Sequence, residues 1–293
     1  MISVIIPYTD NETYKKRLEI TLESIMHQES VEKEIIVSET GDEKTLDLNS
    51  DIKHLLMPAE TSFNPSRPKN HGAKKAEGEI LYFSDADIIF KDPKYLKKLQ
   101  DRIEEGKNLY LTSPKMLRFC RREFETLYSR VKKHGFRETL ENIEVMDEYL
   151  ATLDKKSEIE VFTKEENGVK EVQIADKEDL KRYLESDRDR NEPRYWTLNV
   201  HRGGLVVPKK YFEFVGGFSH KYGGWGCEDD DINQKLDHFW NGEYIEIPVI
   251  HQDHPRGYFV KEEWLENQKN LDKRKEKDIY EVVKNDREDY RKI

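Results

Sequence analysis

The sequence has no apolar run near the roughly 20 residues that a membrane-spanning helix needs, and it has only 2 cysteines. Cys120 and Cys227 form no spaced metal-binding pattern. The first residues carry neither a basic segment nor a small-residue cleavage site, so no secretory signal is visible. We therefore expect a cytoplasmic protein without a transmembrane segment, whose cysteines are free thiols. A single disulfide between them stays an alternative.

A net basic charge is also missing, because 60 acidic residues outnumber 50 basic ones and the formal net charge is -10. Domains that bind nucleic acid usually carry a net positive charge, so we expect no nucleic-acid partner. The length of 293 residues allows one large domain or two modest ones. The 12 Phe, 15 Tyr and 4 Trp residues can still build a core in this strongly charged chain.

Four short apolar runs in the first part of the chain read as β-strands, and helix-like segments separate them. The first run is continuous and ends at a proline, which is typical of a strand buried on both faces. The alternation predicts an α/β fold, an open parallel sheet with helices on both faces. These strands cover residues 3–7, 34–38, 52–57 and 80–84.

The rest of the chain divides into a domain and a tail. The domain covers residues 1–260 and includes a charged, mostly helical insertion at about 117–192, with a hairpin near Asn167-Gly168. Residues 261–293 have few apolar anchors, so we expect a charged helical tail that packs on the domain or binds a partner. The mixed charge of this tail gives no strong sign of peripheral membrane contact but leaves it open.

Two acidic clusters, Asp85-Ala86-Asp87 and Glu228-Asp229-Asp230-Asp231, dominate the polar pattern. The first follows a buried strand directly, and ligands of open α/β sheets bind beyond such strand ends. Neighbouring carboxylates repel each other unless a cation lies between them, and divalent cations prefer such hard oxygen ligands. A bound cation often carries phosphate oxygens as well, so the clusters predict an enzyme that handles a phosphorylated substrate.

A glycine-rich stretch with two aromatic residues precedes the second cluster. Gly216-Gly217 and Gly223-Gly224 allow positive φ angles and close backbone approach, and they flank Phe218 and precede Trp225. An aromatic ring held in such a loop can stack on a sugar, and a following carboxylate can take a proton from a hydroxyl. The acids could also simply favour the start of a helix through its dipole. Four acids in a row exceed what capping requires.

Two histidines, His251 and His254, follow a strand-like run at residues 245–250. Isolated histidines are commonly ordinary polar residues, but imidazole nitrogens are also frequent metal ligands. Their place at a strand end, in a chain with two carboxylate clusters, makes either histidine a candidate ligand for the predicted cation.

Taken in order, these motifs resemble nucleotide-sugar glycosyltransferases of the GT-A fold. The opening Ser3-Val4-Ile5-Ile6-Pro7-Tyr8 and the later Ser84-Asp85-Ala86-Asp87 resemble the inverting, family 2-type enzymes. The stretch from Trp225 to Asp231 resembles the β-1,4-galactosyltransferases and the bacterial chondroitin polymerases. The resemblance covers residues 2–90 and 197–256. It implies a Rossmann-like open mixed sheet flanked by helices, with a helical insertion and a C-terminal helix.

The resemblance implies transfer of a hexose or N-acetylhexosamine from a UDP-sugar to a hydroxyl of a saccharide acceptor, with inversion. Mn²⁺ or Mg²⁺ would be ligated by Asp87 and His251. Asp229 and Glu228 would be the catalytic carboxylates, with Asp229 as the general base and Glu228 also binding acceptor or donor hydroxyls. Trp225 would stack on the acceptor. The donor would contact Pro7, Tyr8, Glu39, Arg67, Asn70 and Asp85.

Two positions depart from the pattern of these enzymes. Ser38-Glu39 stands in place of the usual acid pair after the second strand, and Cys227 replaces a common glycine. A retaining GT-A transferase of the mucin type, with a similar tryptophan–glutamate segment, is one alternative. A non-catalytic module that binds a nucleotide sugar or a carbohydrate is another, although such a module needs no base. A nucleotidyltransferase lacks support, because no glycine-rich, lysine-containing phosphate loop follows the first strand.

Overall fold

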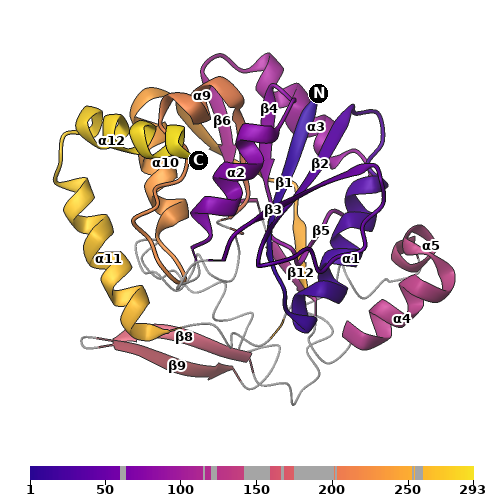
Figure 1. Cartoon of the computed structure of the whole chain (residues 1–293). Coiled ribbons are helices and arrows are strands. Elements are labelled where there is room, and N and C mark those ends of the chain that lie inside the picture. The colour runs from indigo at the N-terminus through magenta and orange to yellow at the C-terminus, as the bar shows by residue number, and fades with distance from the viewer. Residues whose placement is uncertain are drawn as a thin grey trace.

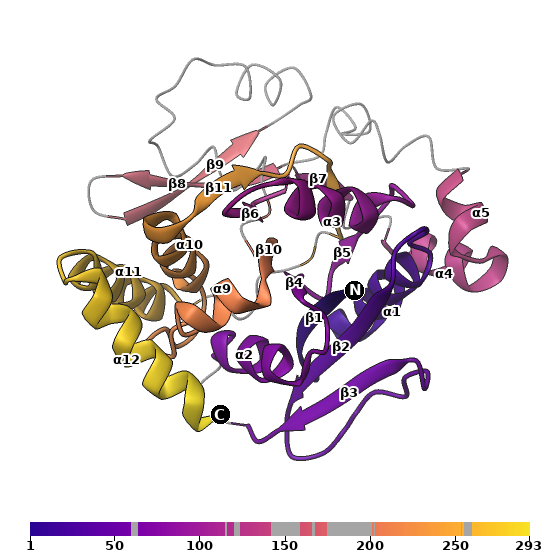
Figure 2. The ribbon, with the colours of Figure 1, turned by 90° about the horizontal axis from the view of Figure 1, so that it is seen from above.

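The computed structural model describes residues 1–59, 64–114, 116–119, 124–141, 159–165, 168–174, 201, 203–252, 254 and 260–293. At its centre lies a seven-stranded sheet in the order β11-β6-β10-β4-β1-β2-β3, with helices on both faces (Figures 1 and 2). Its strands are β1 Ile2–Thr9, β2 Lys33–Thr40, β3 Ile52–Met57, β4 Ile80–Phe83, β6 Leu109–Thr112, β10 Leu205–Pro208 and β11 Asn241–Tyr244.

The sheet is mixed and not wholly parallel. β1 runs parallel to β2 and β4, whereas β10 is antiparallel to both β4 and β6. Side chains of successive residues on a strand point to opposite faces. The β1 residues Val4 and Ile6 accordingly join one core cluster, whereas Ile5 joins the other. The predicted α/β fold, an open mixed sheet flanked by helices, is confirmed.

Each face of the sheet is covered by its own set of helices. The helices α1 and α3 supply Leu18, Leu22 and Leu99 to the first core cluster. The second core cluster, on the opposite face, contains Phe212 and Leu236, which lie on helices of that face. The helices of the first face are α1 Glu12–Met26 and α3 Tyr95–Glu105, and those of the second are α2 Ser66–Lys75, α9 Lys209–Phe214, α10 Glu228–Phe239 and α12 Ile279–Lys292.

A small three-stranded sheet connects distant parts of the chain beside the main sheet. It has the order β5-β12-β7, from β5 Ile88–Ile89, β12 Val249–Gln252 and β7 Met116–Phe119. β12 is antiparallel to β5, and the register places His251 opposite Ile88. This pairing brings the end of the β4–β5 segment and the predicted histidine ligands together, although they are far apart in the sequence.

The predicted insertion is described in part. It contains β7, the helices α4 Phe124–His134 and α5 Phe136–Glu141, and an antiparallel hairpin of β8 Ile159–Glu165 and β9 Gly168–Ile174. This hairpin lies where the turn signal at residues 167–168 predicts it. Cys120 and residues 175–200 lie outside the described part of the chain.

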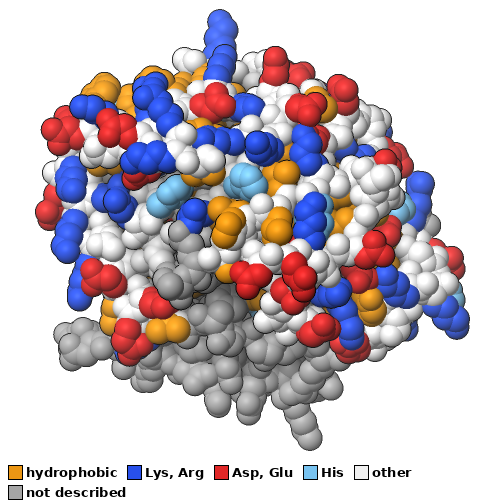
Figure 3. All heavy atoms as spheres, viewed as in Figure 1, with side chains coloured by type: hydrophobic (Ala, Val, Ile, Leu, Met, Phe, Trp, Pro, Cys, Tyr) orange, Lys and Arg blue, Asp and Glu red, His pale blue; other side chains and the backbone are white. Residues whose placement is uncertain are grey.

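The C-terminal segment forms two helices, α11 Lys261–Lys275 and α12, joined near Asp278. Asp278 caps α12, since its side chain accepts hydrogen bonds from the backbone amides of Tyr280 and Glu281. Val283 and Tyr290 of α12 pack into the second core cluster. The outer surface near these helices mixes acidic and basic side chains (Figures 1 and 3). Among the described helices, none is sufficiently long and apolar to cross a membrane.

Candidate active site

A carboxylate and two imidazoles converge where β4 ends and β12 passes. The Oδ2 atom of Asp87 lies 2.8 Å from Nε2 of His254 and 3.4 Å from Nε2 of His251. One potential ligand atom from each of the three residues lies within 4.8 Å of the other two. The structure thus brings together the predicted pair, Asp87 and His251, and adds His254. This histidine is the closer of the two to the carboxylate and is buried.

The chemistry of this cluster fits a divalent cation. Burial opposes ionisation of Asp87, but His251 and His254 outweigh it and hold the pKa of this carboxyl well below its usual range. The Oδ1 atom of Asp87 is buried and makes no hydrogen bond with any residue that the structure describes. A buried oxygen without a partner is unfavourable, and a bound metal ion is one group that would satisfy it. Carboxylate and imidazole ligands together suit ions such as Mn²⁺.

A second cluster surrounds a buried lysine. Lys69 comes from α2, and its side chain is only 2% exposed. Its Nζ atom lies 3.0 Å from Oδ1 of Asp229 and 3.4 Å from Oε1 of Glu228. Both acids stand in the first turn of α10, where the helix dipole also favours them. The capping explanation and the functional one are therefore compatible.

The two carboxylates beside Lys69 are in different environments. Burial raises the pKa of Glu228 to about 7, helped by the negative charge of Asp229 and opposed by Lys69. The Oε2 atom of Glu228 is buried and accepts no hydrogen bond from the described residues. The side chain of Asp229, in contrast, is 22% exposed. A molecule outside the protein can therefore reach Asp229 more easily than Glu228.

Asp85 connects the two clusters electrostatically. Desolvation and the charges of Asp87 and Asp229 raise the pKa of Asp85, and His201 and Lys69 oppose them. His201, which is buried, places Nε2 3.7 Å from Oδ2 of Asp85. Because Asp85 interacts with a member of each cluster, both clusters belong to one charged region beyond the end of β4. Its side chain is 43% exposed, so this region is open to a ligand at Asp85.

Cys227 occupies the backbone conformation that glycine favours. Its φ angle is 77°, in the left-handed region, directly before α10 begins. Burial raises the pKa of its thiol to about 12, and Gln268 donates a hydrogen bond to Sγ at 2.8 Å. Cys227 therefore adopts a backbone turn that glycine favours, and its buried thiol is unreactive.

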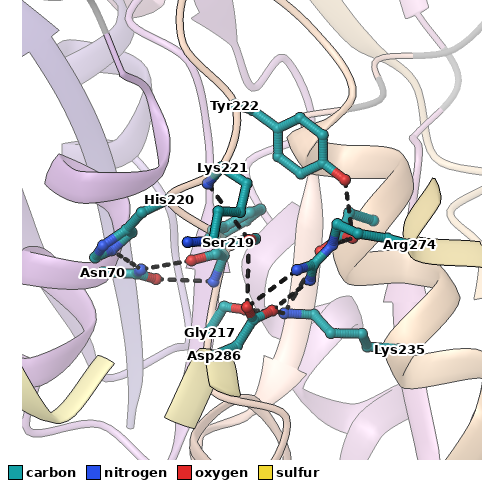
Figure 4. Close-up of polar contacts among 11 residues, drawn as sticks. Asn70, Gly217, Ser219, His220, Lys221, Tyr222, Lys235, Arg274 and Asp286 are labelled. Carbon is teal, nitrogen blue, oxygen red and sulfur yellow. Dashed lines mark hydrogen bonds and ion pairs between the residues drawn. The ribbon is translucent and has the colours of Figure 1, made fainter. Parts of the chain in front are cut away.

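Two of the predicted donor residues use their polar atoms within the protein. Glu39 is fully buried and accepts hydrogen bonds from the amide and the hydroxyl of Thr45, and its other oxygen lies 2.5 Å from Nε2 of His54. Asn70 is also fully buried. Its amide exchanges two hydrogen bonds with the backbone of Phe218 and lies 3.0 Å from Nε2 of His220 (Figure 4). Donor contacts by Glu39 and Asn70 stay predictions.

The remaining predicted residues lie at the expected ends of elements. Pro7 and Tyr8 are in the last part of β1, and burial raises the pKa of Tyr8 to about 12. Arg67 is half-buried in the first turn of α2. Burial lowers the pKa of His220, and the positive charge of Arg67 lowers it further. Trp225 is half-buried in the loop before α10. Their contacts with donor or acceptor stay predictions.

Lys69 and His201 are not predicted from the sequence, and the resemblance favours His251 over His254. Lys69 lies in a segment rich in lysine and alanine, so nothing in its neighbours marks it as the buried one. In the folded chain the ring of Phe218 lies 4.7 Å from Nζ of Lys69. This contact joins distant segments, so the sequence around Lys69 gives no sign of it. For His254, a second histidine three residues after His251 was the available signal.

Comparisons with known proteins identify a family. Residues 3–162, more than half of the chain, match the model of "Glycosyl transferase family 2", and residues 184–248 match "N-terminal domain of galactosyltransferase". Among curated proteins, none matches this chain significantly.

Solved structures similar to this chain include the mannosyltransferase PcManGT from Pyrobaculum calidifontis in complex with GDP-Man and Mn²⁺. The identity is 13% and the TM-score 0.48, over 88% of this chain and 58% of that one. TarS from S. aureus is 16% identical with a TM-score of 0.49, over 93% and 39%. TarS 1-349 in complex with UDP gives 16% and 0.47, over 92% and 64%. This chain therefore spans less than two thirds of each of these solved chains.

Proposed function

We propose, from the premise that this chain belongs to glycosyl transferase family 2, that it moves a hexose or N-acetylhexosamine from a UDP-sugar to a hydroxyl of a saccharide acceptor. The observation that supports this proposal most is the presence of two charged clusters, one around Asp87 and one around Lys69. One cluster has the donor set for a divalent cation. The other offers a partly exposed carboxylate beside a fixed positive charge.

Asp87, His251 and His254 would hold a Mn²⁺ or Mg²⁺ ion. Such an ion would neutralise the negative charge that develops on the departing diphosphate. The two imidazoles must be neutral to act as ligands, so binding of the ion would be accompanied by release of any protons that they carry.

Asp229 is the proposed general base. It takes the proton of the acceptor hydroxyl while that oxygen forms a bond to the anomeric carbon, and the bond from this carbon to the phosphate oxygen breaks with its electron pair. Lys69 binds Oδ1 of Asp229 at 3.0 Å, so it fixes the orientation of this carboxylate. Attack from the side opposite the leaving group would give a product with inverted configuration, which proton NMR of the anomeric signal distinguishes from retention.

The donor specificity is tested by a screen for UDP release. UDP-Gal, UDP-GalNAc, UDP-Glc and UDP-GlcNAc are each incubated with the protein in Mn²⁺ and in EDTA, without acceptor and with a set of mono- and oligosaccharides. We expect metal-dependent release from at least one donor, increased by an acceptor. Binding of a donor without any release under all conditions would favour the non-catalytic module, and no binding of any UDP-sugar would contradict the proposal.

A further inference from the structure

The loop that carries Trp225 is held by one side chain of α11. The Nδ2 atom of Asn267 donates to the carbonyl oxygen of Gly223 at 2.8 Å, and it lies 3.2 Å from that of Gly226 and 3.3 Å from that of Trp225. Asn267 is only 3% exposed. Three carbonyl groups of one short loop therefore converge on a single buried amide.

The same helix packs directly against the glycines of this loop. Gly224 and Gly226 have φ angles of 71° and 94°, which side-chain-bearing residues rarely adopt. A Cβ atom at Gly224 would collide with the carboxylate of Glu263, and one at Gly226 would lie 3.2 Å from the ring of Trp264. The loop therefore fits closely against α11, and side chains at these two glycines would disturb this contact.

The C-terminal end of α11 forms ion pairs with α10, the helix that carries the proposed base. Arg274 pairs with Asp231 in the first turn of α10 and with Asp286 of α12, both at 2.6 Å. Lys235 of α10 pairs with Asp286 at 2.6 Å, and Tyr222 donates to Asp231 at 2.9 Å (Figure 4). These groups are nearly all buried. Paired buried charges of this kind hold one arrangement, because separating them leaves a charge uncompensated.

We propose that Asn267 is a positioning residue for acceptor binding. It fixes the position of the Gly223–Gly226 loop relative to the start of α10. This inference rests on the proposed function, since it assumes that Trp225 and Asp229 meet the acceptor. The C-terminal helices are then part of the acceptor site's framework. A tail that only docks a partner would need no three-carbonyl contact with a loop of the domain.

Hydrogen exchange measured by mass spectrometry tests the positioning directly. We compare the wild-type protein with Asn267→Ala, Asn267→Asp and the control Asn270→Ala, which removes an amide elsewhere on α11. Asn267→Ala is expected to speed exchange in peptides covering residues 220–232 by about tenfold, because the loop loses its buried donor. Asn267→Asp keeps the shape but places a carboxylate against carbonyl oxygens, so its effect should be at least as large. Exchange in Asn267→Asp equal to the wild type would overturn the inference.

Kinetics separates positioning from general stability. With the donor and acceptor found in the UDP-release screen, Asn267→Ala should raise the KM for the acceptor about tenfold, while the KM for the donor stays within twofold. Asn267→Ser, which retains a donor, should recover part of the loss. Equal changes in both KM values, or none in either, would contradict the positioning role. If the wild type shows no transfer, the proposed function fails, and the hydrogen-exchange result still decides whether Asn267 holds the loop.

Discussion

Asp87 and Glu228 are both buried carboxylates of one charged region, yet their pKa values move in opposite directions. Two imidazoles hold the pKa of Asp87 below its usual range, whereas burial and Asp229 raise that of Glu228 to about 7. The first cluster is built from groups that can release protons and accept a cation. The second already contains its positive charge, Lys69. The second cluster therefore has an internal counter-charge, whereas the first has a donor set that could hold a cation from solution.

The largest effect is expected from removing the base beside Lys69. Asp229→Asn keeps the shape of the side chain but cannot take a proton, so sugar transfer should fall by ~10² to 10⁴. Calorimetry should show UDP binding largely unchanged, because the cation cluster is intact. Asp230→Asn is the matched control, since it changes the next acid of α10, and it should retain most of the activity. Equal losses in both variants would remove Asp229 from the role of base.

Removing the positive charge of the second cluster should mainly affect folding. Lys69→Met leaves Glu228 and Asp229 together without their lysine, so the free energy of unfolding should fall by about 3 to 5 kcal/mol at pH 8. Urea unfolding measures this change. Lys75→Met, at the exposed end of the same helix, should change it by no more than about 0.5 kcal/mol. A loss as small as that of Lys75→Met would show that the acids need no internal counter-charge.

The cation cluster should respond through metal affinity. Altering groups that support a metal ligand commonly costs 10- to 100-fold in affinity, so His254→Ala and His251→Ala should each weaken Mn²⁺ binding by at least about tenfold. The alanine variant of the exposed His27 is the control. Titration with Mn²⁺ followed by calorimetry compares the three. Wild-type affinity in one of the first two variants would assign the ligand role to the other histidine alone.

A smaller effect concerns the pH dependence of stability. The folded-state pKa of Glu228 is about 7 and its ordinary value 4.5, so the folded protein holds this proton more tightly. The contribution of Glu228 to stability is therefore lost as pH rises from about 4.5 to about 7, and it stays lost above.

Glu228→Gln removes this loss, because its amide does not ionise. The variant should gain about 3 kcal/mol over the wild type at pH 8, and this advantage should shrink as pH falls to about 4.5. Thermal melts across this pH range measure it. A constant difference between the two proteins at all pH values would show that Glu228 has the same pKa in the folded and the unfolded protein.

Local patterns were sufficient to predict much of the fold. The apolar runs at residues 3–7 and 80–84 are strands because burial on both faces requires continuous apolar sequence, and Asp87 follows the second of them as predicted. The hairpin near residue 167 follows from turn chemistry that acts between neighbours. The antiparallel position of β10 could not be read from such patterns, because strand direction depends on pairing between distant segments.

The candidate site was predictable where one segment carries the signal and not where several must meet. Asp87 and His251 each stand at the end of an apolar run, but the proximity of His254 to Asp87 comes from the pairing of β12 with β5. The burial of Lys69 likewise depends on contacts with residues about 160 positions away. A lysine is usually exposed, so the sequence favours the wrong environment for it.

Calorimetric titration of UDP in the presence of Mn²⁺ tests the central claim most directly. The claim is that the cluster around Asp87 binds the diphosphate through a cation, whereas Asp229 acts on the acceptor and not on UDP. The wild type and Asp229→Asn are predicted to bind UDP with similar affinity in Mn²⁺ and more weakly in EDTA. Asp87→Ala is predicted to bind no better in Mn²⁺ than in EDTA. Manganese-dependent binding that survives in Asp87→Ala, or that disappears in Asp229→Asn, would contradict the account.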